Sequence, residues 1–192
     1  DMLENVSKVL LGSKEDYEDL LNQVESMDLK DPSNYEKIKK RIDLENFIDY
    51  QVFQIILGNR DWPHNNVKYW RNNKTNSRWR WLLYDLDEAM KYPKMDPVAL
   101  ALGKDEQRIE ELDSVYLKST LLLRSLMDNN VFKRKFLIRM SEHLNVTFKN
   151  ERVQAIIDSL SNMFRPHIED HFNRWYPMLY LQKSDDGKLL SS

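Results

Sequence analysis

The sequence predicts a mainly α-helical fold with one small β-hairpin. Glycine and proline are scarce, with 4 and 6 in 192 residues, whereas average usage would supply about 13 glycines. This shortage favours helices over an all-β sandwich. Apolar residues recur at helical spacing through much of the chain, and one stretch, residues 66–84, is instead rich in Val, Tyr, Trp and Leu around a run of turn formers.

The first half of the chain contains three predicted helices. Apolar spacing predicts helices over 14–27 and, after a Pro-containing break, over 34–40. Asp43 is the predicted N-cap of a third helix over 44–57, which is apolar on nearly all sides and is therefore expected to be buried. Gly58 follows it, as is typical of a helix C-terminus.

The hairpin and the second half follow from turn and capping signals. Strands are predicted over 66–71 and 78–84, on either side of turn formers at 72–77. Residues 92–113 are predicted to be irregular, and the chain after residue 113 to be helical. The predicted helices span 115–128, 131–144, 151–164 and 167–181.

Composition excludes several classes of function. The absence of cysteine excludes disulfides and thiol catalysis, and a net charge of −2 argues against a general nucleic-acid binder. The four glycines are scattered, so the chain has no glycine-rich phosphate loop. No apolar run is long enough to span a membrane, and the first residues do not resemble a signal peptide.

Residues 59–87 carry the chemistry. Asp61 lies in a polar loop, Asn66 follows five residues later, and Asp85 and Asp87 come directly after the hairpin. If Asn66 opens the first strand and Asp85 closes the second, the antiparallel pairing brings both to the same end, where Asp61 also lies. This set suits phosphoryl transfer, with an aspartate that accepts the hydroxyl proton and oxygen ligands for Mg²⁺.

The surroundings of this set are basic. Residues 60–80 contain six Lys or Arg and a single acid, Asp61, which favours an anionic substrate. Arg60 and Asn65 are therefore the candidate cofactor-binding residues. Most tryptophans also fall in this region, and their alternation predicts packing in the core and hairpin rather than a stacking platform.

Three segments resemble the CotH family of atypical protein kinases, which is named after a bacterial spore-coat protein. They are residues 42–50, the run Asn59-Arg60-Asp61-Trp62-Pro63-His64-Asn65-Asn66, and Trp79-Arg80-Trp81-Leu82-Leu83-Tyr84-Asp85-Leu86-Asp87. The resemblance covers about residues 40–180 and implies ATP with Mg²⁺ or Mn²⁺, and Ser or Thr of a protein as substrate. It identifies Asp61 with the catalytic aspartate, Asn66 (or its rival Asn65) with the metal-binding asparagine, and Asp85, with Asp87 as a second ligand, with the metal aspartate.

The sequence departs from the kinase pattern in two ways. Glu88-Ala89-Met90 follows the Asp-Leu-Asp motif, so no glycine stands there. The first forty residues also cannot form the β-rich lobe that contacts ATP in a kinase. The expectation is therefore a C-terminal lobe whose N-terminal lobe lies outside these residues, inactive alone and located at the cell surface or spore coat.

The predicted organisation has three parts. A helical segment, 1–41, precedes a kinase-like lobe, 42–183, and a tail, 184–192. The lobe comprises a catalytic loop at 59–66, the hairpin at 66–84, the metal motif at 85–87 and a helical bundle at 114–182.

Two other functions stay open at this point. A metal-dependent glycosyl- or phosphotransferase would use Asp85 and Asp87 to hold a metal and a nucleotide-sugar. A non-catalytic helical interaction module would use neither residue.

Overall fold

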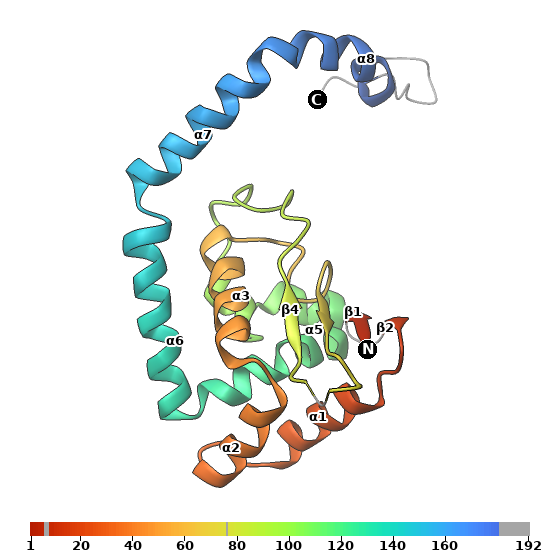
Figure 1. Cartoon of the computed structure of the whole chain (residues 1–192), viewed down its shortest axis with the longest axis vertical. Helices are drawn as coiled ribbons and strands as arrows, with labels where there is room; N and C mark the ends of the chain where they lie inside the picture. The colour runs from red at the N-terminus through yellow and green to blue at the C-terminus, as the bar shows by residue number, and fades with distance from the viewer. Residues whose placement is uncertain (6–7, 76, 181–192) are drawn as a thin grey trace. The chain divides into compact units, whose positions relative to one another are not determined.

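The computed structural model describes residues 1–5, 8–75 and 77–180, and the chain divides into two compact units, 1–144 and 145–192. The first unit combines a four-stranded antiparallel sheet with six helices (Figure 1). The described part of the second unit, residues 145–180, contains two further α-helices. The mainly helical fold with a small β-region is thus confirmed. No described helix has both the length and the apolar character needed to cross a membrane.

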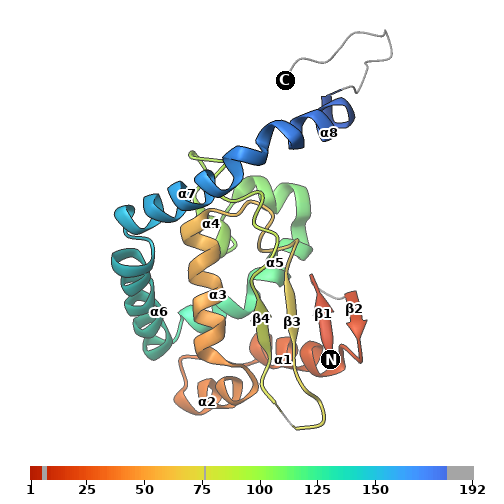
Figure 2. The same ribbon diagram turned by 45° about the horizontal axis from the view of Figure 1, so that its top comes forward.

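The sheet is larger than the predicted hairpin. Its order is β2-β1-β3-β4, which Figure 2 shows side by side, and the two additional strands come from the first eleven residues. The strands are β1 (Met2–Glu4), β2 (Lys8–Leu11), β3 (Lys68–Trp70) and β4 (Arg80–Leu82). The N-terminal segment, expected to be helical and to precede the lobe, therefore contributes half of the sheet on which the site stands.

The register of the hairpin differs by one residue from the prediction. Tyr69 lies opposite Trp81, and continuing the same register sets Asn65, rather than Asn66, opposite Asp85. In this register Trp70 lies opposite Arg80 and not opposite Trp81, the tryptophan of the second strand with which it could have paired across the hairpin. The shift leaves the main consequence intact, because residues 65 and 66 still arrive at the end of the hairpin from which Asp85 leaves.

Helix α3 (Leu44–Leu57) is the central support of the site. The Asp43 side chain caps it by accepting from the Asn46 N–H, and Gly58 ends it in the left-handed region with φ of 56°. Both termini were predicted. Two further helices precede it, α1 (Glu15–Ser26) and α2 (Pro32–Arg41).

Strand β4 is attached along its outer edge to the start of α3. The Asn46 side chain accepts from the Trp81 N–H at 2.6 Å and donates to the Trp81 carbonyl at 3.2 Å. The Phe47 ring packs against the Trp81 ring with centroids 4.6 Å apart. Trp62, Trp79 and Trp81 are 2%, 0% and 4% exposed, which confirms that these tryptophans are core residues.

The region after the hairpin contains more helix than predicted. Residues 92–113, expected to be irregular, include α4 (Pro97–Ala101) and the first part of α5 (Glu106–Met127). Asp96 and Asp105 cap these helices by accepting from backbone N–H groups. The acidic stretch 105–113, part of the region expected to be irregular, thus begins with a helix cap, and Asp113, with φ of 41°, marks a kink inside α5.

The last helices agree closely with the prediction. Helix α6 (Asn130–Glu142) continues into a π-helical turn (His143–Thr147). In the second unit, α7 (Asn150–Phe164), a 3₁₀ turn (Arg165–His167) and α8 (Ile168–Tyr180) follow one another. The predicted helix end at 181 and the tail at 184–192 lie outside the described residues.

Candidate active site

The loop between α3 and β3 is fixed by a buried asparagine. Asn59 is 1% exposed, and its side chain donates to Gln54 Oε1 at 3.0 Å. Its own Oδ1 accepts from the Asp61 N–H at 3.2 Å. Trp62, on the other side of Asp61, is also buried. The backbone of Asp61 is therefore held between two core residues while its side chain stays half-buried.

The Asp61 carboxylate accepts hydrogen bonds from both candidates for the metal-binding asparagine, Asn65 and Asn66. Its Oδ2 accepts from Asn66 Nδ2 at 2.9 Å and from Asn65 Nδ2 at 3.4 Å. Among the described contacts, none engages Asp61 Oδ1. One carboxylate oxygen is thus used to position the loop, and the other is available to a substrate.

A residue that sequence analysis missed completes this part of the site. Asn5, at the end of β1, donates from Nδ2 to Asn65 Oδ1 at 3.3 Å, and its own Oδ1 accepts from the Val67 N–H at 3.2 Å. The apolar run Lys8–Leu11 before Gly12 is a strand signal that could have indicated a β-structure here. This contact also distinguishes the two candidates for the metal-binding asparagine. The side-chain oxygen of Asn65 accepts a hydrogen bond from Asn5, whereas no described contact uses the side-chain oxygen of Asn66.

The Asp85 carboxyl stands among other carboxylates. The pKa of Asp85 is raised, and the largest cause is desolvation. The charge of Asp87, a hydrogen bond with Asp87 and the charge of Asp61 contribute in decreasing order. Lys68 opposes this rise. The Lys68 ammonium lies 4.1 Å above the centre of the Tyr84 ring and 3.3 Å from Glu4 Oε1. Excess negative charge at Asp85 is the environment that a divalent cation would stabilise.

Three of the residues at this site have positive φ angles. Asn5, Asn66 and Asp85 have φ of 56°, 53° and 51°. Asparagine and aspartate tolerate the left-handed region better than most residues, and such strained positions cluster at functional sites. These residues lie where β1 ends, where β3 begins and where the chain leaves β4.

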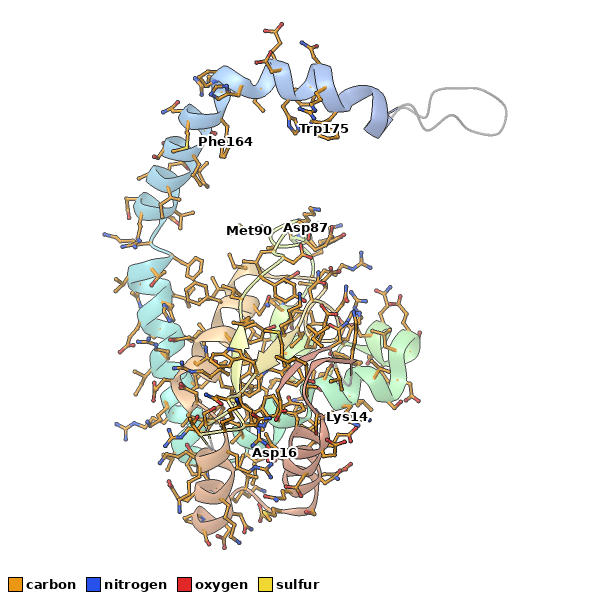
Figure 3. All side chains as sticks on the ribbon, turned by 45° about the vertical axis from the view of Figure 1, so that its right-hand side comes forward. Lys14, Asp16, Asp87, Met90, Phe164 and Trp175 are labelled. Carbon is orange, nitrogen blue, oxygen red and sulfur yellow. The ribbon has the colours of Figure 1, made fainter. Side chains whose placement is uncertain are left out.

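Arg60 points in a different direction from the carboxylates. Its guanidinium lies 4.7 Å from the centre of the Tyr92 ring, and its carbonyl accepts from Arg108 at 3.0 Å. Its backbone N–H donates to the Glu88 carbonyl at 3.5 Å. Arg60 thus faces the segment that follows the metal motif, and no described contact joins its side chain to Asp85. Figure 3 shows Asp87 of the metal motif and Met90 of the following segment together at the top of the first unit, away from Lys14 and Asp16.

The predicted metal ligands form a small donor set. Among the described residues, no three His, Cys, Asp or Glu side chains converge closely enough to hold a metal. Asn66, Asp85 and Asp87 supply two carboxylates and one amide. Magnesium commonly takes one or two carboxylates and completes its shell with water and substrate phosphates. The set therefore fits Mg²⁺ or Mn²⁺ shared with a nucleotide, rather than a metal held by protein ligands alone.

One comparison with known proteins identifies the chain. The family model described as CotH kinase protein matches residues 3–187, nearly the whole length. The match includes residues of β1, which agrees with the contact between Asn5 and the Asp61 loop. No curated protein and no solved structure matches at significant similarity. The chain belongs to the CotH kinase family.

Proposed function

We propose that this chain carries the phosphoryl-transfer residues of a protein kinase. The kinase transfers the γ-phosphoryl group of ATP to a Ser or Thr hydroxyl of a protein at the cell surface or spore coat. The observation that carries the proposal is the hydrogen bond between Asp61 Oδ2 and Asn66, beside the charge-rich Asp85. It joins a candidate base to one candidate metal ligand, and the charge of the same base acts on a second, Asp85, an arrangement that suits phosphoryl transfer.

Asp61 acts as the base. Because its Oδ2 is held by amide groups, the carboxylate is oriented with Oδ1 toward the acceptor hydroxyl, whose proton it receives as the oxygen attacks phosphorus. Asn59 fixes the backbone from which this side chain extends. The loop thus supplies positioning, which is the main contribution of the protein in phosphoryl transfer.

Asn66, Asp85 and Asp87 hold the metal. When bound, Mg²⁺ or Mn²⁺ neutralises the charge of the ATP phosphates and of the leaving group. Asn66 is preferred over Asn65, because the Asn65 oxygen already accepts from Asn5. The role of Asp85 is to present an anionic oxygen to the cation. Desolvation first, and then the charges of Asp87 and Asp61, raise the pKa of this carboxyl, and a bound cation would offset these effects.

The test is transfer of labelled γ-phosphate from ATP by the full-length protein. We expect Asp61→Asn to lower the rate about 100-fold or more, since loss of a general base costs about 10²–10⁴ in rate. ATP affinity should be retained. The matched control is Asp170→Asn, an exposed aspartate of α8.

The same assay separates the alternatives. Equal rates for wild type and Asp61→Asn would contradict the role of the base. Transfer from a nucleotide-sugar but not from ATP would favour a glycosyltransferase, for which the Asp61–Asn66 contact has no evident use. Absence of nucleotide binding in any form would favour an interaction module.

A further inference from the structure

A groove lies beside the proposed base. It encloses about 600 Å³ between Arg60, the segment 91–96 and the start of α5. This volume is within the range of ligand-binding pockets, which is about 300–1,000 Å³. Its lining includes neither Asp61 nor any of the proposed metal ligands. The groove lies against the backbone of the loop that carries Asp61, because Arg60 directly precedes Asp61 and Arg108 of the groove donates to the Arg60 carbonyl at 3.0 Å. A molecule in the groove would contact this loop without occupying the metal site.

The groove is cationic. Four of its lining residues are basic, namely Arg60, Lys91, Lys94 and Arg108. Its two carboxylates, Asp96 and Asp105, are engaged as helix caps, because each accepts from backbone N–H groups of the helix that follows.

Two of the four cations lack a counter-ion. Lys91 pairs with Glu88 at 2.7 Å, and Arg108 lies 3.6 Å from Glu111. In the described ranges, no carboxylate lies within ion-pair distance of Arg60 or Lys94. The Arg60 guanidinium lies over the Tyr92 ring, and the charges of Glu111 and Glu88 act on it only from beyond ion-pair distance. The Arg60 guanidinium and the exposed Lys94 ammonium therefore favour binding of an anionic group in the groove, such as a carboxylate or a phosphate.

The chain segment that forms the groove does not supply this anion. Residues 88–113 contain no Ser or Thr, so the segment cannot be phosphorylated on either residue type. The hydroxyl of Tyr92 already donates to Glu88 Oε2 at 2.7 Å. An anion that occupied the groove would therefore come from another molecule, and a molecule that also reached Asp61 would be the phosphate acceptor.

We propose that this groove binds an acidic or phosphorylated side chain of the protein substrate, and thereby positions a neighbouring Ser or Thr at Asp61. The inference rests on the proposed function, because it assigns the acceptor side of the same site. The substrate class is then a protein segment with an anionic side chain near the Ser or Thr whose hydroxyl accepts the phosphoryl group. The two residues would lie within about four positions of each other, the reach of a short extended peptide.

The experiment measures binding of fluorescein-labelled peptides to the full-length protein by anisotropy. Three peptides carry one Ser and, beside it, Asp, phosphoserine or Asn. We expect the two anionic peptides to bind about tenfold more tightly than the Asn peptide, as one or two charged hydrogen bonds would give. A preference for phosphoserine alone would identify phosphate as the anion and would also support the proposal.

Variants of Lys94 connect the preference to the groove. Lys94→Glu should abolish it and Lys94→Arg should retain it, whereas Lys133→Glu, on the exposed surface of α6, should leave it unchanged. Because Lys94 is exposed, a charge change there should not prevent folding, and Lys94→Gln provides a milder second variant. Equal affinity for all three peptides, or an anionic preference that survives Lys94→Glu, would overturn the proposal. Peptide binding needs no phosphoryl transfer, so its failure is distinct from failure of the kinase assay.

Discussion

The loop at 59–66 and the segment at 88–96 touch each other but are stabilised in different ways. In the loop, buried Asn59 and Trp62 hold the backbone, and side-chain amides hold Asp61. In the segment, exposed side chains dominate, and their contacts include the Lys91–Glu88 ion pair, the Tyr92–Glu88 hydrogen bond and the cation–π contact of Tyr92 with Arg60. Under the proposed function, the loop would fix the geometry of catalysis, whereas the segment would determine which substrate is bound.

The largest expected difference lies within the loop. Asn66→Ala should weaken binding of ATP with Mn²⁺ by about 10- to 100-fold, as loss of groups at a metal site does. Asn65→Ala should have a smaller effect, because Asn65 contacts Asp61 only at 3.4 Å and its oxygen is engaged by Asn5. Isothermal titration calorimetry checks this, and a larger effect at Asn65 would reverse the assignment.

The anchor of the loop should matter for stability as well as for activity. Asn59→Ala should lower the free energy of unfolding by about 2 kcal/mol, because it leaves buried polar partners without hydrogen bonds. The exposed Asn130→Ala serves as control and should change it by less than about 0.5 kcal/mol. Urea denaturation measures both. If the two variants were equally stable, the Asn59 contacts would not be what fixes Asp61.

The ion pair between Asp49 of α3 and Arg139 of α6 should have an intermediate effect on the free energy of unfolding. Hydrogen bonds from Arg139 lower the pKa of Asp49, which also contacts His143. The folded pKa lies below the usual value, so the stabilisation is complete above about pH 4 and is lost as the pH falls through the folded pKa. Both side chains are over a third exposed, so we expect roughly 0.5–1 kcal/mol.

Denaturation of wild type and Asp49→Asn at pH 7 and near pH 3 tests this expectation. The difference in unfolding free energy between the two proteins should shrink at the lower pH. A difference that stays constant or grows on acidification would show that the charge of Asp49 is not its source.

The groove segment should show the smallest effect on stability. Lys94→Gln should change the free energy of unfolding by less than about 0.5 kcal/mol, because Lys94 is exposed and forms no described ion pair. A large loss of stability would mean that the segment is structural, and would remove the contrast with the loop.

Helices and strands that depend on neighbouring residues could be predicted from the sequence, whereas those that depend on residues far apart in the chain could not. Helix α3 was predicted with both ends, because Asp43 and Gly58 act on neighbouring residues. Strands β1 and β2 were missed, since β1 pairs with β3, which lies more than sixty residues away. The first part of α5 was missed because Asp105 and the acids after it were interpreted as a loop rather than as a cap and first turn.

The site shows the same limit. Asp61 and Asn66 were predicted to meet, and they do, because one short loop joins them. Asn5 escaped prediction because its contact with Asn65 depends on the pairing of β1. The hairpin register was wrong by one residue, since turn formers spread over several positions do not fix a centre. The direction of Arg60, toward Tyr92, depends on the folded segment after the metal motif.

The central claim is that Asp85 and its neighbours bind a divalent cation together with ATP. The most direct test is calorimetric titration of the full-length protein with ATP in the presence and absence of Mn²⁺, for wild type and Asp85→Asn. We expect wild type to bind ATP only in the presence of Mn²⁺, and Asp85→Asn to lower the affinity for ATP with Mn²⁺ by about tenfold or more. Binding of ATP that needs no metal, or that Asp85→Asn leaves unchanged, would contradict it.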